Sequence, residues 1–248
     1  MKADGEATAI KLGQAELQVG VRIGATISTR NYLSAQHLWT ARYNAELCRQ
    51  REVAIAGKRP IDVEHRSYAT TAVLMSVAFL EATVNEVFED TTDDRHVGQR
   101  VEPLEPRVRA MLASFWESVG NGRYSLLGKY QMALLLSGAG QFDKGAQPYQ
   151  DAQLLIDFRN GLVHFRPDWH DSGTKRKFDS LGDRFHQSGL LSDEDGSDWL
   201  TVKALGVSGA DWALATAKAF ADEWTSRLGI PKLYDQDVAN MDKELSGD

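Results

Sequence analysis

Hydrophobic and polar positions alternate strictly along residues 17–27. The odd positions in this segment are all apolar, whereas the even positions carry Gln, Gly, Arg or Thr. A period of two predicts a half-buried strand. Residues 199–205 form a second, shorter candidate strand with alternate apolar residues on one face. The two strands could pair as a small sheet. Because residues 1–31 contain the longer strand, we expect them to form an N-terminal β segment.

The rest of the chain favours helices. Few Gly or Pro residues interrupt six stretches that are rich in good helix formers. The six stretches are 32–56, 64–89, 107–119, 126–136, 149–164 and 210–228. The sequence therefore predicts a mainly α protein, a helical bundle with a small β element from the N-terminal segment.

The stretch 64–89 is the candidate central helix. Residues 72–80 are apolar around a single serine, so this part of the helix is apolar on nearly all sides, as expected of a helix surrounded by others. The apolar run is far shorter than the roughly 20 residues that span a bilayer. The N-terminus lacks the basic start and apolar run of a signal peptide. We therefore expect a soluble protein that does not engage a membrane.

The expected organisation is one large domain with decorations, because 248 residues can bury a sizeable core. The polar C-terminal residues are expected to fray. The predicted parts are an N-terminal β segment at 1–31, a helical core at 32–166, a charged loop or insertion with a short strand at 167–207, a C-terminal helix packed on the core at 208–230 and a polar tail at 231–248.

Composition and charge narrow the classes of function. Hydrophobic residues make up 42% and charged residues 25% of the chain, close to average globular usage. The net charge of -7 argues against binding nucleic acid through overall charge, although it allows a local basic patch. Cys48 is the only cysteine, so no disulfide within the chain and no multi-cysteine zinc site can form. These features fit a cytoplasmic protein without a metal or other cofactor.

Residues 149–164 combine an apolar helix face with polar residues that need an explanation. At about 100° per residue Arg159 falls inside the apolar arc, where a guanidinium is costly unless its donors are paired. Asn160 and His164 are four residues apart, so their side chains are neighbours on the opposite side. Pro167 places His164 in the last turn, where the helix dipole favours a protonated imidazole and titration near neutral pH.

The spacing Arg159-x4-His164 near the end of an apolar helix resembles the signature of the HEPN superfamily. The helix at 68–89 looks like the long early helix of uncharacterised HEPN-like proteins of prokaryotes, and residues 142–151 are similar to the approach to the motif helix in such proteins. The resemblance covers roughly residues 33–166, and its functional motif is short.

This resemblance implies a helical bundle, usually dimeric, and in many members a metal-independent ribonuclease or toxin. It assigns Arg159, Asn160 and His164 to the active centre. His164 would move a proton to or from the ribose 2′-OH or the leaving oxygen, and Arg159 would stabilise the pentacovalent phosphate, while Asn160 orients either one. The products would be a 2′,3′-cyclic phosphate and a 5′-OH. Two motif helices meeting across a two-fold axis would line one cleft, with Gly161 allowing close approach.

Further residues extend this hypothesis. Glu81 lies on the mostly apolar central helix and needs a partner, such as Arg159. In the active centre we expect it to have an auxiliary role at most. Arg166 and the basic cluster Lys175, Arg176 and Lys177 could contact RNA phosphates. A solvated charge cluster on a loop is the commoner explanation for such residues.

Three hypotheses follow. The first is a HEPN-like ribonuclease that acts as a homodimer, a toxin or defence effector with a possible cognate antitoxin. The second is a non-catalytic HEPN-like module that binds RNA, a nucleotide or a protein through the same cleft. The third is a helical scaffold, in which Arg159 holds the bundle through a buried pair with Glu81 or Asp157 and His164 merely caps a helix.

Overall fold

The computed structural model describes residues 9–12, 15–18, 30–55, 62–93, 98–119, 124–165, 177–190 and 200–246. These residues are mainly helical, which confirms the predicted fold class at that level. The chain divides into two compact units, residues 1–31 and residues 32–248, and each unit is described by itself.

The first unit contains a short hairpin. Strand β1 (Ala9–Leu12) pairs antiparallel with β2 (Ala15–Gln18), with Ala9 opposite Gln18. Residues 17 and 18 of the strand predicted at 17–27 belong to this hairpin, whereas residues 19–27 lie outside the described part of the chain. The hairpin therefore overlaps the predicted strand at residues 17 and 18 and begins before it.

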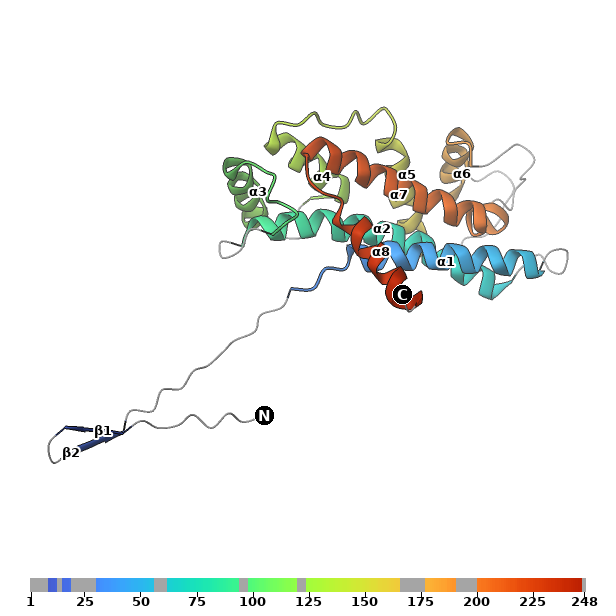
Figure 1. Ribbon diagram of the computed structural model, residues 1–248. Coiled ribbons are helices and arrows are strands. Elements are labelled where there is room, and N and C mark those ends of the chain that lie inside the picture. Colours follow the sequence, from blue (N-terminus) through green and yellow to red (C-terminus); the bar gives the residue numbers. More distant parts are fainter. Residues whose placement is uncertain are drawn as a thin grey trace. The chain divides into compact units, whose positions relative to one another are not determined.

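Most of the described residues of the second unit form helices (Figure 1). The six predicted helices correspond to α1 to α5 and α7, and each predicted boundary lies within three residues of the observed one. In chain order the helices are α1 (Ser34–Ile55), α2 (Val63–Thr91), α3 (Pro106–Val119), α4 (Leu126–Ser137), α5 (Tyr149–Val163), α6 (Lys177–Gln187), the π-helical turn η2 (Leu200–Ala204), α7 (Val207–Leu228) and α8 (Leu233–Ser246).

Polar side chains and glycines set the ends of several helices. The Asp62 carboxylate caps α2 by accepting a hydrogen bond of 2.8 Å from the backbone N–H of His65. The Ser125 hydroxyl caps α4 in the same way. Gly138 and Gly229 end α4 and α7 with φ of 75° and 69°, left-handed values that favour glycine.

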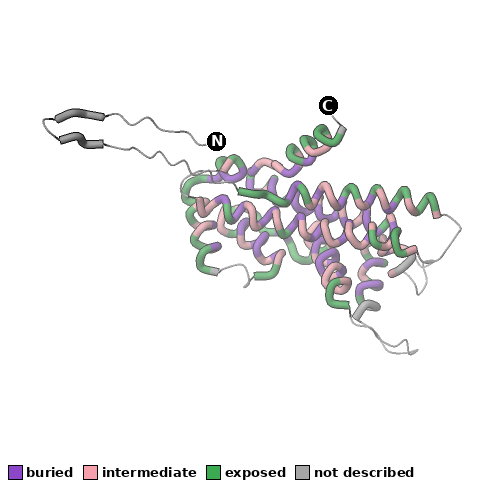
Figure 2. The backbone as a smooth tube through the Cα atoms, turned by 90° about the horizontal axis from the view of Figure 1, so that it is seen from below, coloured by how far each residue is buried: buried purple, intermediate pink, exposed green. Residues whose placement is uncertain are grey.

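Helix α2 is the central helix of the bundle, as its apolar middle predicts. It packs against α1, α3, α4, α5 and α7. Val73, Phe79, Leu80 and Phe88 on this helix are fully buried. Figure 2 shows buried positions recurring along the long helices, as expected where each helix turns one face to its neighbours.

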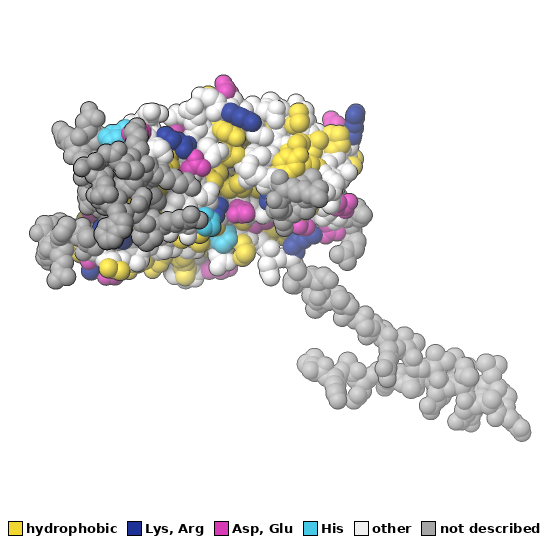
Figure 3. Space-filling view, turned by 180° about the vertical axis from the view of Figure 1, so that it is seen from behind, with side chains coloured by type: hydrophobic (Ala, Val, Ile, Leu, Met, Phe, Trp, Pro, Cys, Tyr) yellow, Lys and Arg dark blue, Asp and Glu magenta, His cyan; other side chains and the backbone are white. Residues whose placement is uncertain are grey.

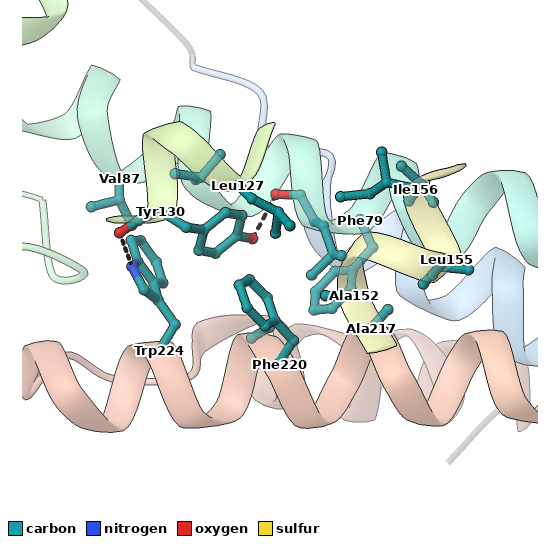
Figure 4. Packing of buried hydrophobic residues seen from close by; sticks show 14 of the residues in the cluster. Phe79, Val87, Leu127, Tyr130, Ala152, Leu155, Ile156, Ala217, Phe220 and Trp224 are labelled. Carbon is teal, nitrogen blue, oxygen red and sulfur yellow. Dashed lines mark hydrogen bonds between the residues drawn. The ribbon is translucent and has the colours of Figure 1, made fainter. Parts of the chain in front are cut away.

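Aromatic side chains from α4 and α7 fill the space beside α2 (Figure 4). The Tyr130 hydroxyl donates to the backbone carbonyl of Leu80 at 2.7 Å, and Trp224 Nε1 donates to the backbone carbonyl of Tyr130 at 3.1 Å. Phe220 packs edge to face on Tyr130, with ring centroids 4.9 Å apart. These contacts tie α2, α4 and α7 together, because each buried polar atom finds its partner on a neighbouring helix.

The strand predicted at 199–205 is wrong. Residues 200–204 form the turn η2, in which the Leu205 N–H donates to the Leu200 carbonyl at 2.9 Å. The turn lies directly on α7, because a Cβ added to Gly209 would meet the Ala204 carbonyl oxygen at 2.0 Å. Three alternating apolar residues are too few to distinguish a strand from a helical turn.

The tail predicted at 231–248 is polar in composition, but residues 233–246 of it form helix α8, which the sequence did not predict. Tyr234 and Val238 are buried, and Trp39 Nε1 on α1 donates to Asp242 Oδ1 at 3.0 Å. The two buried residues are four positions apart and share one helix face. A single apolar stripe thus docks a helix whose overall composition is polar.

The charged loop predicted at 167–207 is described in part. It contains α6, on which Leu181 and Phe185 are buried. The Phe185 ring packs edge to face on Phe158 of α5, with centroids 5.1 Å apart. Residues 166–176 and 191–199 lie outside the described residues.

Among the described residues, α2 is the one helix that is long and apolar enough to cross a membrane. In the bundle, 61% of the most apolar 18-residue stretch of this helix is buried inside the protein. The central helix of a bundle has this composition because neighbouring helices cover it on most sides.

Candidate functional site

The C-terminal end of α5 carries the predicted motif. Leu155 and Phe158 are buried, and the helix packs against α7 and α2. Arg159 and Asn160 are half-buried, whereas His164 is exposed just beyond the last helical residue. The His164 backbone N–H donates to the Asn160 carbonyl at 2.9 Å. The last turn of α5 therefore keeps these two residues adjacent.

Arg159 is held loosely. Its Nη2 lies 3.9 Å from Oε2 of Glu81 on α2, and the two side chains are 26% and 52% exposed. Its Nε is buried and has no hydrogen-bond partner among the described residues. A guanidinium has five N–H donors. Because Nε is buried, the donors that Arg159 can offer to an anionic ligand are those of its two Nη groups, which have only the long contact with Glu81 among the described residues.

Asp157, the other acid considered as a partner of Arg159, is engaged elsewhere. Its carboxylate accepts hydrogen bonds from Arg184 Nη1 at 2.5 Å and from Gln153 Nε2 at 2.9 Å. Within the described part of the chain, Arg159 thus forms its ion pair with the half-exposed Glu81. An exposed pair of this kind contributes under about 1 kcal/mol, which is little for a contact whose role is to hold a bundle together.

The side chains of Asn160 and His164 form no hydrogen bond within the described residues. Val163 and Phe165 flank His164 and are 54% and 56% exposed. Hydrophobic side chains are also exposed elsewhere on the molecule, between charged ones (Figure 3). At the motif they form an apolar rim around a histidine that solvent can reach.

Lys129 is a buried cation near Glu81 that the sequence analysis did not identify. It lies on α4 and is 4% exposed, with Nζ donating to Asn85 Oδ1 at 2.9 Å and lying 5.2 Å from the centre of the Trp116 ring. Burial lowers the pKa of Lys129, and the negative charge of Glu81 partly opposes that shift. The signal for this residue is a single charge inside the apolar stretch 126–136.

Glu81 and Asn85 lie one turn apart on α2 and connect two cations. Arg159 contacts Glu81 from α5, while Lys129 contacts Asn85 from α4. Glu81 and Asn85 therefore both have partners on neighbouring helices, as polar side chains on a mostly apolar helix need. On a chain with a net charge of -7, this side of α2 thus holds two positive groups, one beside Glu81 and one beside Asn85.

Several residues predicted to belong to the site cannot be placed. Arg166, Lys175 and Arg176 lie outside the described residues, and Lys177 begins α6 without a described side chain. The structure brings together Arg159, Asn160, His164 and Glu81 at the end of α5 and on α2, and adds Lys129 with Asn85.

Comparison of the chain with protein-family models, with curated proteins and with solved structures finds no match.

Proposed function

We propose that the protein is a HEPN-like, metal-independent endoribonuclease with Arg159, Asn160 and His164 in its active centre. The observation that carries this proposal is that Arg159 is only weakly engaged by other side chains. Its Nε has no hydrogen-bond partner among the described residues, its ion pair with Glu81 is 3.9 Å long, and an exposed histidine lies little more than one turn away. A guanidinium and a histidine at the same end of one helix are groups that could together cleave a phosphodiester.

The proposed reaction is an attack of the ribose 2′-OH on the adjacent phosphorus. His164 accepts the 2′-OH proton, and the 5′ oxygen takes a proton from water as it leaves, so the products are a 2′,3′-cyclic phosphate and a 5′-OH. Arg159 donates hydrogen bonds to the phosphate oxygens as negative charge builds up on them. Asn160 orients the phosphate or the imidazole from its position one turn before His164.

Glu81 has an auxiliary part in this proposal. Its carboxylate contacts the guanidinium that the phosphate must bind, so RNA and Glu81 compete for Arg159. Because the pair is long and half-exposed, displacing it costs little. Glu81 would therefore hold Arg159 in place between reaction cycles.

A homodimer suits the same surface. Val163 and Phe165 expose apolar area on both sides of His164, and a second copy packed on them would bring two motifs into one cleft. Arg166 and the cluster at 175–177 would supply phosphate contacts that an acidic chain otherwise lacks. Such an enzyme would act in the cytoplasm as a toxin or defence effector, with a cognate antitoxin as a partner.

One observation favours a second candidate, a non-catalytic module that binds a nucleotide or a protein through the same surface. The net charge of -7 opposes long RNA, whose affinity depends on releasing counterions from many phosphates. A ligand with one or two phosphates needs only the local Arg159 site. The module would bind such a ligand and leave RNA intact.

Incubation of total RNA with the purified chain in EDTA separates the two candidates. Wild type should cleave RNA and leave cyclic-phosphate ends, and His164→Ala should not cleave. His186→Ala is the matched control, because His186 is also an exposed histidine and lies on α6. Intact RNA with a folded wild-type protein would reject the enzyme, and equal cleavage by wild type and His164→Ala would show a contaminating nuclease.

A further inference from the structure

A second group of reactive side chains lies between α1 and α2. Cys48 and Glu52 are on α1 and His65 is on the first turn of α2, and their sulfur, carboxylate oxygen and ring nitrogen all lie within 4.8 Å of one another. We propose that these three residues form a binding site for a zinc ion. The site uses none of the residues of the α5 motif, so the inference does not depend on the proposed ribonuclease.

Local structure places the three ligands together. Cys48 and Glu52 are four residues apart on one helix, so their side chains lie on the same face. His65 is fixed by the α2 cap, because its backbone N–H donates to Asp62. Arg51 in turn holds that carboxylate with two hydrogen bonds, of 3.1 and 2.8 Å. The imidazole is therefore positioned by a cap that α1 itself supports.

The chemistry of the set suits zinc. Thiolate sulfur, imidazole nitrogen and carboxylate oxygen are the three ligand types that zinc prefers, and three protein ligands leave a fourth position for water. Cys48 and Glu52 would together carry two negative charges, which balance a divalent cation. Cys48 and His65 are buried, whereas the Glu52 side chain is 53% exposed. An ion could therefore enter from the Glu52 side and be enclosed on the other.

Proton transfers accompany binding. The Cys48 thiol loses its proton to solvent as sulfur bonds to the metal. His65 Nε2 now lies 2.9 Å from Glu52 Oε2, a distance at which the two atoms share a proton. Zn²⁺ bonds to Nε2 of the neutral His65 tautomer that carries its proton on Nδ1, and any further proton held between Nε2 and Glu52 passes to solvent.

A purely structural role explains only part of the cluster. Glu52 Oε2 lies 2.9 Å from His65 Nε2, and Glu52 also accepts a hydrogen bond from the backbone N–H of Val207 at the start of α7. This leaves Cys48 with a weak contact, 3.7 Å from its sulfur to the His65 carbonyl oxygen. A nucleophilic role for the thiol does not fit either, because Cys48 is 0% exposed and no substrate could reach it. A metal ion is small enough to use all three groups.

Cobalt binding tests the site, because Co²⁺ replaces Zn²⁺ in such sites and reports its ligands by absorption. The full chain is stripped with EDTA, freed of chelator and titrated with Co²⁺. We expect one equivalent to produce the visible bands of tetrahedral cobalt together with a near-ultraviolet thiolate-to-cobalt band, and Zn²⁺ to abolish both. Since Cys48 is the only cysteine, a stoichiometric thiolate band has one possible source in the chain.

Variants locate the remaining ligands. Cys48→Ser should remove the thiolate band, and Glu52→Gln and His65→Gln should weaken zinc binding. Loss of one outer hydrogen bond to a ligand costs about 10- to 100-fold in metal affinity, so loss of a ligand should cost at least that. His186→Gln, on α6, should bind like wild type. Zinc should also raise the thermal midpoint of wild type and not that of Cys48→Ser.

Wild type alone decides the outcome if a variant fails to fold. Absence of the thiolate band and of a zinc-dependent thermal shift in folded wild type would overturn the proposal. Binding with full affinity in Cys48→Ser would also overturn it, since it would place the metal elsewhere. The RNA cleavage assay is done in EDTA, so failure of either proposal leaves the other standing.

Discussion

Arg100 Nη1 lies 2.7 Å from Asp90 Oδ2, and the two side chains are 8% and 2% exposed. The same guanidinium donates from Nη2 to Glu86 Oε2 at 3.0 Å. Glu86 in turn accepts from the backbone N–H groups of Leu33 and Ser34 at 2.8 Å each. The arginine thus joins the end of α2 to the start of α1, where the second unit begins.

Replacing Arg100 should therefore destabilise the bundle. Arg100→Ala leaves two carboxylates buried without their cation, a change that costs about 3–5 kcal/mol. The free energy of unfolding in urea measures this loss. Arg42→Ala is the control, because Arg42 and Asp242 form an ion pair with side chains 47% and 43% exposed, and such pairs contribute under about 1 kcal/mol. Similar losses in both variants would show that the Arg100 network is not buried as described.

The contact between η2 and α7 predicts that replacing Gly209 by alanine lowers the free energy of unfolding more than replacing Gly140 does. Gly209→Ala would place a methyl group 2.0 Å from the Ala204 carbonyl oxygen, so the turn must move, and overpacking of this kind costs roughly 1–3 kcal/mol or more. Gly140→Ala meets nothing within 4 Å and should change stability by less than about 1 kcal/mol. Urea unfolding of both variants checks the difference, and an unchanged Gly209→Ala would contradict the close approach.

The sequence could predict the helices because their signals are local. Residues 72–80, apolar around a single serine, become the buried middle of α2, and α4 ends at Ser137, one residue beyond the predicted stretch 126–136. The same local patterns failed at 199–205 and at α8. In α8, Tyr234 and Val238 are too few to mark a helix face against a polar background.

The site could be predicted only in part, because its contacts are long-range. The helical periodicity places Arg159 in the apolar arc, where it needs an acidic partner. The sequence offers two candidates for that partner, Glu81 and Asp157. Choosing between them required the packing of α5 on α2, since Asp157 is taken by Arg184. The bond between Lys129 and Asn85 joins residues 44 positions apart, and no spacing rule relates them.

Lys129 gives a prediction about pH. Burial lowers its pKa below the ordinary value of 10.5, so between the lowered pKa and 10.5 the unfolded state binds more protons than the folded state. Stability contributed by this group therefore rises with pH in that window. Wild type should gain stability relative to Lys129→Met as the pH rises toward 10.5, measured by urea unfolding of both proteins across that range. A difference that stays constant would mean that Lys129 is as well solvated when folded as when unfolded.

Glu81→Gln tests whether Glu81 competes with RNA for Arg159, and it depends on the proposed ribonuclease. The contact is 3.9 Å long with Glu81 52% exposed, so its loss should change stability by under about 1 kcal/mol. Removing the negative charge beside the guanidinium should lower KM for RNA severalfold and leave kcat nearly unchanged, because His164 is untouched. Glu117→Gln removes an exposed acid from α3 and is the control for overall charge.

The same comparison separates competition from direct participation. Binding of uncleaved RNA to His164→Ala, with and without Glu81→Gln, gives the affinity without turnover. Tighter binding in the double variant supports competition at Arg159, since a carboxylate that no longer pairs with the guanidinium leaves its donors to phosphate. A fall in kcat to the level of His164→Ala would instead assign Glu81 a step in the reaction, and equal KM in Glu81→Gln and Glu117→Gln would show that Glu81 does not restrict Arg159 at all.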